Sequence, residues 1–422
     1  MTPLDIDMAC IPAIIEMQQN GIRINPDHFA RITQEFTNEA DHIQAEIEQE
    51  YGKHVNVRSN GCDGQLSKML VEMKIYARPL PVDKKTLAKH IAHPIIRKVQ
   101  LVKHLEYLKS NFTHKMPKMA DSNWRIHTDL LLTRTTSGRF ASKNPNQQNI
   151  PTRTKHGKLI RCGFIPADGC VLVSIDYAGI EMRYCAHKAH DKKMIESIYK
   201  NDYESGDDLH TITAKEMFDL ESITKQERGA GKETNFKIVY GTTEYGLYDG
   251  FIVAGLVDSE GQPLYDLDDC KAFIQSWQHT WPDSYRYMQA LHSFIEMNGY
   301  VENAYGFRRD MSMVYSHDKR LVDKAMREGG NMPIQSDAAA NMKIAIPLAL
   351  DVCHRWEEAD IRCKMLMTIH DELLFEIDQN YWEIIAQELR EVMEGAVDLS
   401  IATPCDIEQG LTWGNMEEIE LN

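Results

Sequence analysis

GCVLVSIDY, residues 169–177, predicts a buried β-strand because it is a short apolar run with several β-branched residues. MLMTIHDELLFEID, residues 365–378, predicts a β-hairpin because two apolar runs flank a polar triplet. Outward from these strands the chain is mostly helical, with apolar residues at three- and four-residue steps. This spacing marks residues 28–51, and residues 94–110, 210–247 and 267–298 also read as mainly helical. The sequence therefore predicts an α+β fold.

Acidic residues stand at the ends of these predicted strands. Asp176 ends the first strand, and His370, Asp371 and Glu372 form the tip of the hairpin. In the plainer interpretation, Asp176 caps the next helix and the triplet is an ordinary polar turn. In the functional interpretation, one aspartate from each strand meets the other. Two such carboxylates repel unless cations hold them, and hard oxygen ligands suit Mg²⁺. A pair of metal ions ~3.5–4 Å apart serves in-line nucleotidyl transfer.

Arg228, Lys232, Phe236 and Tyr240 recur every four residues within RGAGKETNFKIVYG, residues 228–241. At 3.6 residues per turn they lie on one broad face of a helix. Two cations followed by two aromatics suit a ligand with a polyphosphate at one end and a flat ring at the other. The plainer alternative is an amphipathic helix with its aromatics in the core, but this leaves the two cations unexplained.

Two further segments, residues 136–153 and 327–340, combine amides with guanidinium groups. Such groups hydrogen-bond base edges in the minor groove as well as phosphate oxygens. The candidates are Arg139, Gln148, Asn149, Arg153, Arg327, Asn331 and Gln335. Taken one by one, they are ordinary surface residues.

Charge is distributed unevenly along the 422 residues, which carry a net charge of −16. Residues 372–422 hold 13 acids and one base, so this tail contributes −12. Residues 133–164 hold seven bases and no acid, and residues 84–118 hold nine bases and one acid. Two basic tracts in an acidic chain indicate a polyanion partner, although each tract alone is compatible with a solvated surface.

The remaining composition excludes several classes of protein. No apolar run approaches the roughly 18 residues that a membrane-spanning helix needs. The nine cysteines include no CxxC, which argues against a zinc ribbon or a disulfide framework. The first residues, MTPLDIDMAC, carry no targeting signal. We therefore expect a soluble, multi-lobed protein of the cytoplasm.

Four signatures, taken in order, resemble the polymerase region of family A DNA polymerases, the group of bacterial DNA polymerase I and phage polymerases. They are SGRFASKNPNQQNIPTR, DYAGIEMR at 176–183, RGAGKETNFKIVYG and IHDELLFEI. The resemblance implies a right-hand fold with an antiparallel palm sheet, helical fingers and a helical thumb. It places palm at 1–27, 119–181 and 326–422, the thumb at 28–118 and the fingers at 182–325. It also implies a DNA-directed DNA polymerase of replication or repair. In this arrangement we expect the acidic tail, residues 372–422, to lie at the back of the palm, away from phosphates.

The resemblance also implies roles for individual residues. Asp176 and Asp371 would hold two Mg²⁺ ions, with the backbone carbonyl of Tyr177 helping and Glu372 in support. Lys232 would act as general acid for pyrophosphate. Glu181 would exclude a 2′-hydroxyl, and Phe236 implies poor use of dideoxynucleotides. Contacts to the incoming nucleotide are implied for Arg153, Glu181, His210, Arg228, Lys232, Phe236 and Tyr240. Contacts to primer–template DNA are implied for Arg139, Gln148, Asn149, Arg327, Asn331, Gln335 and His370.

The chain also departs from the family pattern. Gly179, Lys237, Ser336 and Asp337 replace the usual residues at their positions, which bears on rate, fidelity and grip on DNA. A 3′–5′ exonuclease region, which precedes the polymerase region in the family, is not expected in this chain. We therefore expect a monomer that binds primer–template and dNTPs without proofreading, with a separate exonuclease or processivity factor as a further partner.

Two alternatives remain from the sequence. A single-subunit RNA polymerase shares the palm and fingers plan but should lack Glu181. A non-catalytic DNA-binding descendant should have lost an aspartate, whereas Asp176 and Asp371 are both present.

Overall fold

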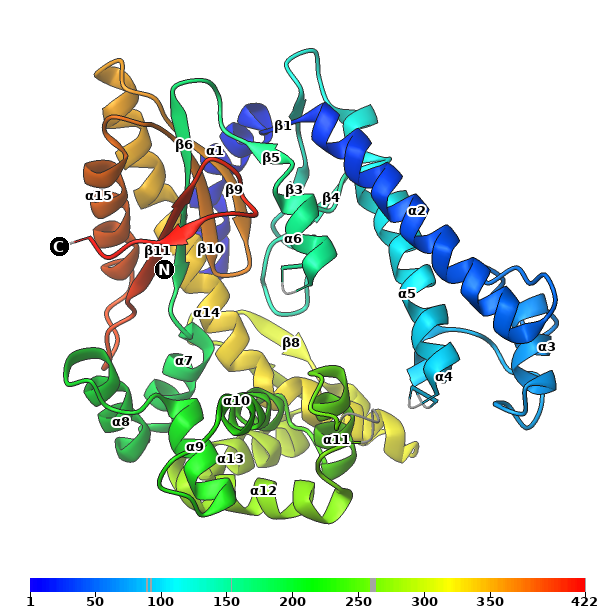
Figure 1. Cartoon of the computed structure of the whole chain (residues 1–422). Coiled ribbons are helices and arrows are strands. Elements are labelled where there is room, and N and C mark those ends of the chain that lie inside the picture. Colours follow the sequence, from blue (N-terminus) through cyan, green and yellow to red (C-terminus); the bar gives the residue numbers. More distant parts are fainter. Residues whose placement is uncertain (89, 92, 153, 259–262, 422) are drawn as a thin grey trace.

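A five-stranded antiparallel sheet lies at the centre of the molecule (Figure 1), with strand order β12-β11-β6-β10-β9. The strands are β6 (Cys170–Tyr177), β9 (Cys363–Ile369), β10 (Glu372–Asp378), β11 (Cys405–Gly410) and β12 (Glu417–Glu418). The predicted strand and the predicted hairpin are both confirmed, and they pair with each other because β6 lies beside β10. The computed structural model describes residues 1–421 except 89, 92, 153 and 259–262.

Three helices cover one face of this sheet. Helix α1 (Pro3–Asn20) packs against β9, and α15 (Trp382–Glu394) packs against β6 and β11. Between them runs α14 (Lys319–Glu358), a 40-residue helix that contacts both. The side chains between the helices and the sheet form a continuous apolar core. The opposite face carries apolar residues of a second core, including Leu172 and Leu374, and becomes polar toward Ser174 and Asp176.

A helical arm projects from the sheet region (Figure 1), as expected for a thumb. Helices α2 (Pro26–Tyr51) and α5 (Pro94–Leu108) run side by side along it and pack together. Two short helices, α3 (Gln65–Glu72) and α4 (Lys84–Ala88), lie at its far end. The apolar residues that recur at three- and four-residue steps in α2 are all buried: Phe29, Ile32, Phe36, Ala40, Ile43 and Ile47.

A second helical lobe lies below the sheet in Figure 1, as expected for fingers. It begins with α7 (Ile180–Ala189) and α8 (Lys192–Tyr203). It continues with α9 (Leu209–Phe218), α10 (Lys225–Val239), α11 (Glu244–Val253), α12 (Leu267–Thr280) and α13 (Pro282–Asn298). Buried hydrogen bonds tie α10 to α9 and α12, because Asn235 accepts from both Thr213 and Trp277.

The remaining elements connect these parts. A small sheet of order β2-β1-β5 joins the arm to the centre, from β1 (Ile22–Ile24), β2 (Arg125–Ile126) and β5 (Phe164–Ile165). Two hairpins, β3 (Asp129–Leu131) with β4 (Ala141–Lys143) and β7 (Tyr300–Glu302) with β8 (Arg308–Asp310), flank the central sheet and the lower lobe. Helix α6 (Lys155–Arg161) precedes β5. Among the described residues, no helix is both long enough and apolar enough to cross a membrane. The right-hand α+β architecture is confirmed, whereas the exact domain limits stay predictions.

Candidate active site

The two predicted aspartates meet at one end of the central sheet. Asp176 lies opposite Glu372 of β10 in the strand register, and Asp371 occupies the adjoining turn. The backbone N–H of Tyr177 donates to the carbonyl of Asp371 across 3.2 Å. His370, at the start of the turn, adopts a left-handed conformation with φ of 58°. The pairing of β6 with β10 therefore brings residues 195 positions apart to one edge.

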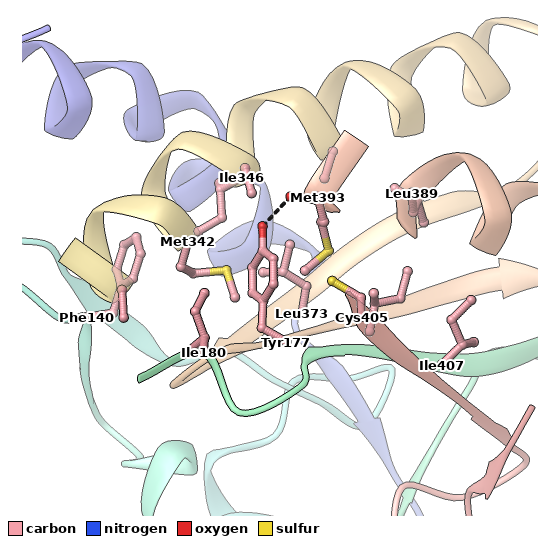
Figure 2. Packing of buried hydrophobic residues seen from close by; sticks show 14 of the residues in the cluster. Phe140, Tyr177, Ile180, Met342, Ile346, Leu373, Leu389, Met393, Cys405 and Ile407 are labelled. Atoms are coloured by element: carbon pink, nitrogen blue, oxygen red, sulfur yellow. Dashed lines mark hydrogen bonds between the residues drawn. The ribbon is translucent and has the colours of Figure 1, made fainter. Parts of the chain in front are cut away.

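Tyr177 fixes the end of β6 from the other face of the sheet. Its ring lies among core residues that include Met342, Leu373 and Met393 (Figure 2). Its hydroxyl donates to the carbonyl of Met393 across 2.5 Å. Because successive strand residues point to opposite faces, an anchored Tyr177 directs the Asp176 side chain outward.

Further acids crowd this edge. Asp406 of β11 lies opposite Asp176, and Glu408 lies opposite Ser174. A cavity of about 390 Å³ is lined by Asp176, Glu372, Asp406, Glu408 and Glu418, with Lys158 and Arg161 also at its wall. The acidic tail was expected at the back of the palm, away from phosphates. That expectation is wrong for the acids of β11 and β12, because antiparallel pairing with β6 carries them to the site.

The crowding shifts the acid–base behaviour of the carboxyls. Partial burial in the cavity raises the pKa of Asp176 to about 8, and the charges of Asp371, Glu372, Asp406 and Glu408 act in the same direction. Burial also raises the pKa of Asp371, against the opposing charge of Arg139. Burial and neighbouring negative charge both disfavour the ionised form of a carboxyl, so the raised pKa marks Asp176 as a carboxylate that an added cation would stabilise.

This donor set fits hard divalent cations. The two aspartates offer oxygen ligands, and an added cation would stabilise their ionised forms against the burial that raises their pKa. In the described part of the chain, no three His, Cys, Asp or Glu side chains are already arranged around one metal position. The remaining ligands would have to be backbone carbonyl, water and substrate oxygens, as is usual for Mg²⁺.

Arg228, Lys232 and Phe236 of α10 face the start of α9. Arg228 donates to Oδ2 of Asp208 from Nε at 2.9 Å and from Nη2 at 2.6 Å. The other oxygen of Asp208 caps α9 by accepting from the backbone N–H groups of His210 and Thr211. Asp208 thus connects the predicted triphosphate cation Arg228 with the backbone that carries His210.

His210 faces the same helix. Its ring lies 5.6 Å from that of Phe236, measured between centroids. Burial lowers the pKa of His210 to about 4; the Asp208 charge opposes this shift, and the charges of Lys232 and Arg228 add to it. His210 is therefore neutral near pH 7. The structure brings four of the predicted nucleotide residues together: His210, Arg228, Lys232 and Phe236.

Glu181, at the start of α7, is held from two sides. Its carboxylate forms an ion pair with Arg139. It also accepts from the Tyr240 hydroxyl, at 2.9 Å on Oε2 and 3.2 Å on Oε1. Gln335 of α14 hydrogen-bonds to the same tyrosine. The predicted nucleotide contacts Glu181 and Tyr240 are therefore joined to two predicted DNA contacts, Arg139 and Gln335.

The other predicted DNA contacts are more scattered. Gln148 is buried and donates its amide to the carbonyl of Thr368 across 3.0 Å, whereas Asn149 and His370 are exposed. Asn331 is 3% exposed, and neither atom of its side-chain amide has a hydrogen-bond partner. Arg327 packs beside Gly241, just beyond the end of α10. Arg153 lies outside the described residues.

The basic tract of the arm is partly used internally. Lys98 pairs with Glu46 at 3.0 Å and also with Glu50. Lys103 donates to Asn60 and to the carbonyl of Ser59, and burial lowers its pKa. In the other tract, Arg161 stacks over the Trp413 ring at 3.8 Å. The count of bases along the sequence therefore overstates the charge that these tracts can offer to a polyanion.

The site residues that were not predicted include Asp208, Asp406 and Glu408. An acid just before a helical stretch is a typical N-cap, so Asp208 had a local signal. Asp406 and Glu408 had no local sequence signal, because their position depends on the pairing of β11 with β6.

The comparisons with known proteins agree with this geometry. Residues 26–415 match the model of DNA polymerase family A. The chain belongs to this family. DNA polymerase I of Caldicellulosiruptor bescii is 30% identical, covering 97% of this chain and 47% of that protein. The thermostable DNA polymerase I of Thermus aquaticus is 28% identical, covering 98% and 48%.

This family A chain spans about half the length of the curated relatives it matches. A solved structure, described as the POL domain of Pol1 from M. smegmatis in complex with DNA primer-template and dNTP, has the same fold. It superposes with a TM-score of 0.82 at 24% identity, covering 96% of this chain and 70% of that one.

Proposed function

We propose that this chain is a template-directed DNA polymerase that adds dNTPs to the 3′-hydroxyl of a primer. The observation that carries the proposal is the meeting of Asp176 and Asp371 at one sheet edge, together with an α10 face built for a triphosphate and a base. Family membership supports it, and so does the similarity to relatives named DNA polymerase I. The solved neighbour was obtained with primer–template and dNTP, the partners proposed for this chain.

Two Mg²⁺ ions are proposed as cofactors at Asp176 and Asp371, with the Tyr177 carbonyl as a further ligand and Glu372 in support. When bound, they would lower the pKa of the primer hydroxyl and neutralise charge on the triphosphate. The support from this chain is chemical: two carboxyls whose pKa is raised by burial lie at an edge bordered by further acids.

The residues of the fingers are proposed to bind and orient the nucleotide. Arg228 and Lys232 would hold the phosphates through charge-assisted hydrogen bonds, and Lys232 would protonate the pyrophosphate as it leaves. Phe236 would contact the sugar and base, and neutral His210 would donate a hydrogen bond to a phosphate oxygen. Arg153 is proposed as a further triphosphate contact.

Glu181 is proposed to select the sugar of the incoming nucleotide, and Tyr240 is proposed to occupy the templating position. A carboxylate held by two donors cannot turn to accept a 2′-hydroxyl, so the chain should prefer dNTPs. This distinguishes it from the single-subunit RNA polymerase alternative. The remaining proposed DNA contacts are Arg139, Gln148, Asn149, Arg327, Asn331, Gln335 and His370.

We further propose that these 422 residues extend primers without excising mismatched ends. The aligned part of the relatives takes up 97% of this chain, which leaves little of it for a second catalytic domain. A separate exonuclease or processivity factor is proposed as a partner. A primer with a mismatched 3′ end tests the proposed absence of excision, because products shorter than the primer would contradict it.

Primer extension by the purified chain tests the main proposal. Templated products should form with Mg²⁺ and dNTPs and disappear with EDTA. Asp371→Ala should abolish extension while primer–template still binds. Binding without extension by the unaltered chain would instead favour the non-catalytic alternative, and a preference for rNTPs would favour an RNA polymerase.

A further inference from the structure

Arg139 occupies an unexpected place for a residue assigned to the primer–template. Its Nη2 donates to Oε1 of Glu181, which lies 42 positions later in the chain. The ion pair is largely shielded from water, with 25% of the Arg139 side chain and 9% of the Glu181 side chain exposed. A contact of this kind between a palm loop and the first turn of α7 fixes the direction of the carboxylate.

The loop that carries Arg139 is itself well supported. The Thr135 hydroxyl donates to the Arg139 carbonyl across 2.6 Å. Gly138, in a left-handed conformation with φ of 77°, lies close to Ser336 of α14. The next residue, Phe140, is buried in the main core (Figure 2). Arg139 is therefore presented to Glu181 from a fixed backbone.

The two donors to Glu181 differ in strength. The Tyr240 hydroxyl is shared between the two carboxylate oxygens, at 2.9 and 3.2 Å. A guanidinium supplies a charge-assisted bond, which is roughly twice as strong as a neutral one. Without Arg139, a nearly buried carboxylate would keep only a neutral donor and could rotate.

We propose that Arg139 is a positioning residue for Glu181, so that the preference for deoxyribonucleotides depends on Arg139 as well as on Glu181. This inference rests on the proposed function and adds a determinant of sugar selection to it. A role of Arg139 on DNA is compatible with it, because a guanidinium has five N–H donors and the others remain for a base edge.

The experiment measures kcat/KM for a dNTP and for the matching rNTP on one primer–template. Arg139→Met should lower the dNTP-to-rNTP ratio at least about tenfold, through the loss of a charged hydrogen bond. Asn149→Ala is the matched control, since Asn149 is an exposed DNA-contact candidate in the same segment, residues 136–153, beyond β4. It should slow both substrates and leave the ratio within about twofold.

Two further variants sharpen the test. In a Glu181→Ala background, Arg139→Met should not change the ratio further, because its target is gone. Arg139→Lys keeps the charge and should give a dNTP-to-rNTP ratio between those of the unaltered chain and Arg139→Met. If Arg139→Met unfolds, the ratio of Arg139→Lys is the test of the inference.

Three results would overturn the inference. The first is an unchanged ratio in Arg139→Met, or in Arg139→Lys if the former unfolds. The second is an equal fall in Asn149→Ala, and the third is an additive effect in the Glu181→Ala background. If the unaltered chain does not extend primers, the proposed function fails and this inference with it. If that chain extends primers and prefers dNTPs, a constant ratio defeats this inference alone.

Discussion

Asp176 shows how one side chain can be unfavourable in the free protein and still be suited to function. Its carboxyl is surrounded by four other acids, and its pKa is raised to about 8. In a protein without ligands this arrangement costs free energy. Beside divalent cations the same arrangement becomes a strong attraction, so the crowding is evidence for what the site binds.

Asp176→Asn should therefore separate activity from binding. The variant keeps the size of the side chain but removes a metal-binding charge, so primer extension should fall by at least about a thousandfold. Affinity for primer–template, measured by fluorescence anisotropy, should change little. Extension at a tenth of the normal rate or more would show that Asp176 is not a metal ligand.

The raised pKa also predicts how stability depends on pH in metal-free protein. Between pH 4 and 8 the folded chain keeps a proton on Asp176 that the unfolded chain, with its ordinary value of 3.8, has released. The folded state binds more protons, so this group makes the protein less stable as pH rises through that window. Unfolding temperatures in EDTA should fall from pH 5 to pH 8, and less so for Asp176→Asn. Parallel curves for the two proteins would contradict the shift.

At the scale of elements, the pairing of α9 with α10 places the residues proposed to bind the nucleotide. Gly231 allows the two helices to touch: a Cβ at this position would lie 2.4 Å from the His210 carbonyl oxygen and 2.9 Å from the Ala214 Cβ. At Gly229, two residues earlier, the nearest atom would be 4.0 Å away, on Leu256. Gly231 is thus needed for packing, whereas Gly229 is not.

Gly231→Ala should push α10 away from α9 and displace Arg228 and Lys232 from His210. We expect a loss of about 1–3 kcal/mol in stability from overpacking, together with a raised KM for dNTP. Gly229→Ala is the control and should add up to about 1 kcal/mol through helix propensity. Chemical denaturation and steady-state kinetics measure both effects. Equal behaviour of the two variants would show that the contact between α9 and α10 does not position the cations.

Local patterns predicted the elements that carry the chemistry. Apolar runs were sufficient to predict β6 and the β9–β10 hairpin. The four-residue spacing was sufficient to predict which side chains share one face of α10. The 40-residue helix α14 was not predicted, because Gly329, Gly330, Pro333 and Pro347 interrupt its sequence with residues that usually end helices. Burial against α1, α13 and α15 overrides that local preference.

The parts of the site that could not be predicted depend on tertiary pairing. The register of β11 against β6 brings Asp406 beside Asp176, and no sequence spacing encodes that register. In the same way, Arg139 and Glu181 form an ion pair although no pattern in the sequence indicates that their two segments come together. The types of the chemical groups were therefore predictable, but their partners were not.

For the whole molecule, the net charge of −16 has to be reconciled with the proposed polyanionic substrate. Acids of α15 lie on the far side of the sheet, whereas those of β11 and β12 line the site, where cations can compensate them. Attraction to phosphates then has to come from local basic surface, and part of that surface is already paired within the arm. Binding should therefore be weaker, and its dependence on salt shallower, than the number of bases suggests.

Salt dependence tests this account. Raising the salt from 50 to 200 mM should weaken primer–template binding at least about tenfold, because each neutralised phosphate adds roughly 0.9 to the log–log slope. Arg134 is exposed within the basic tract at residues 133–164, so Arg134→Ala should reduce the slope by about one. Lys98 is held by Glu46 and Glu50, so Lys98→Met should leave the slope unchanged. A smaller slope in Lys98→Met than in Arg134→Ala would mean that the arm releases its lysines to the duplex and that the pairs seen in the free protein break on binding.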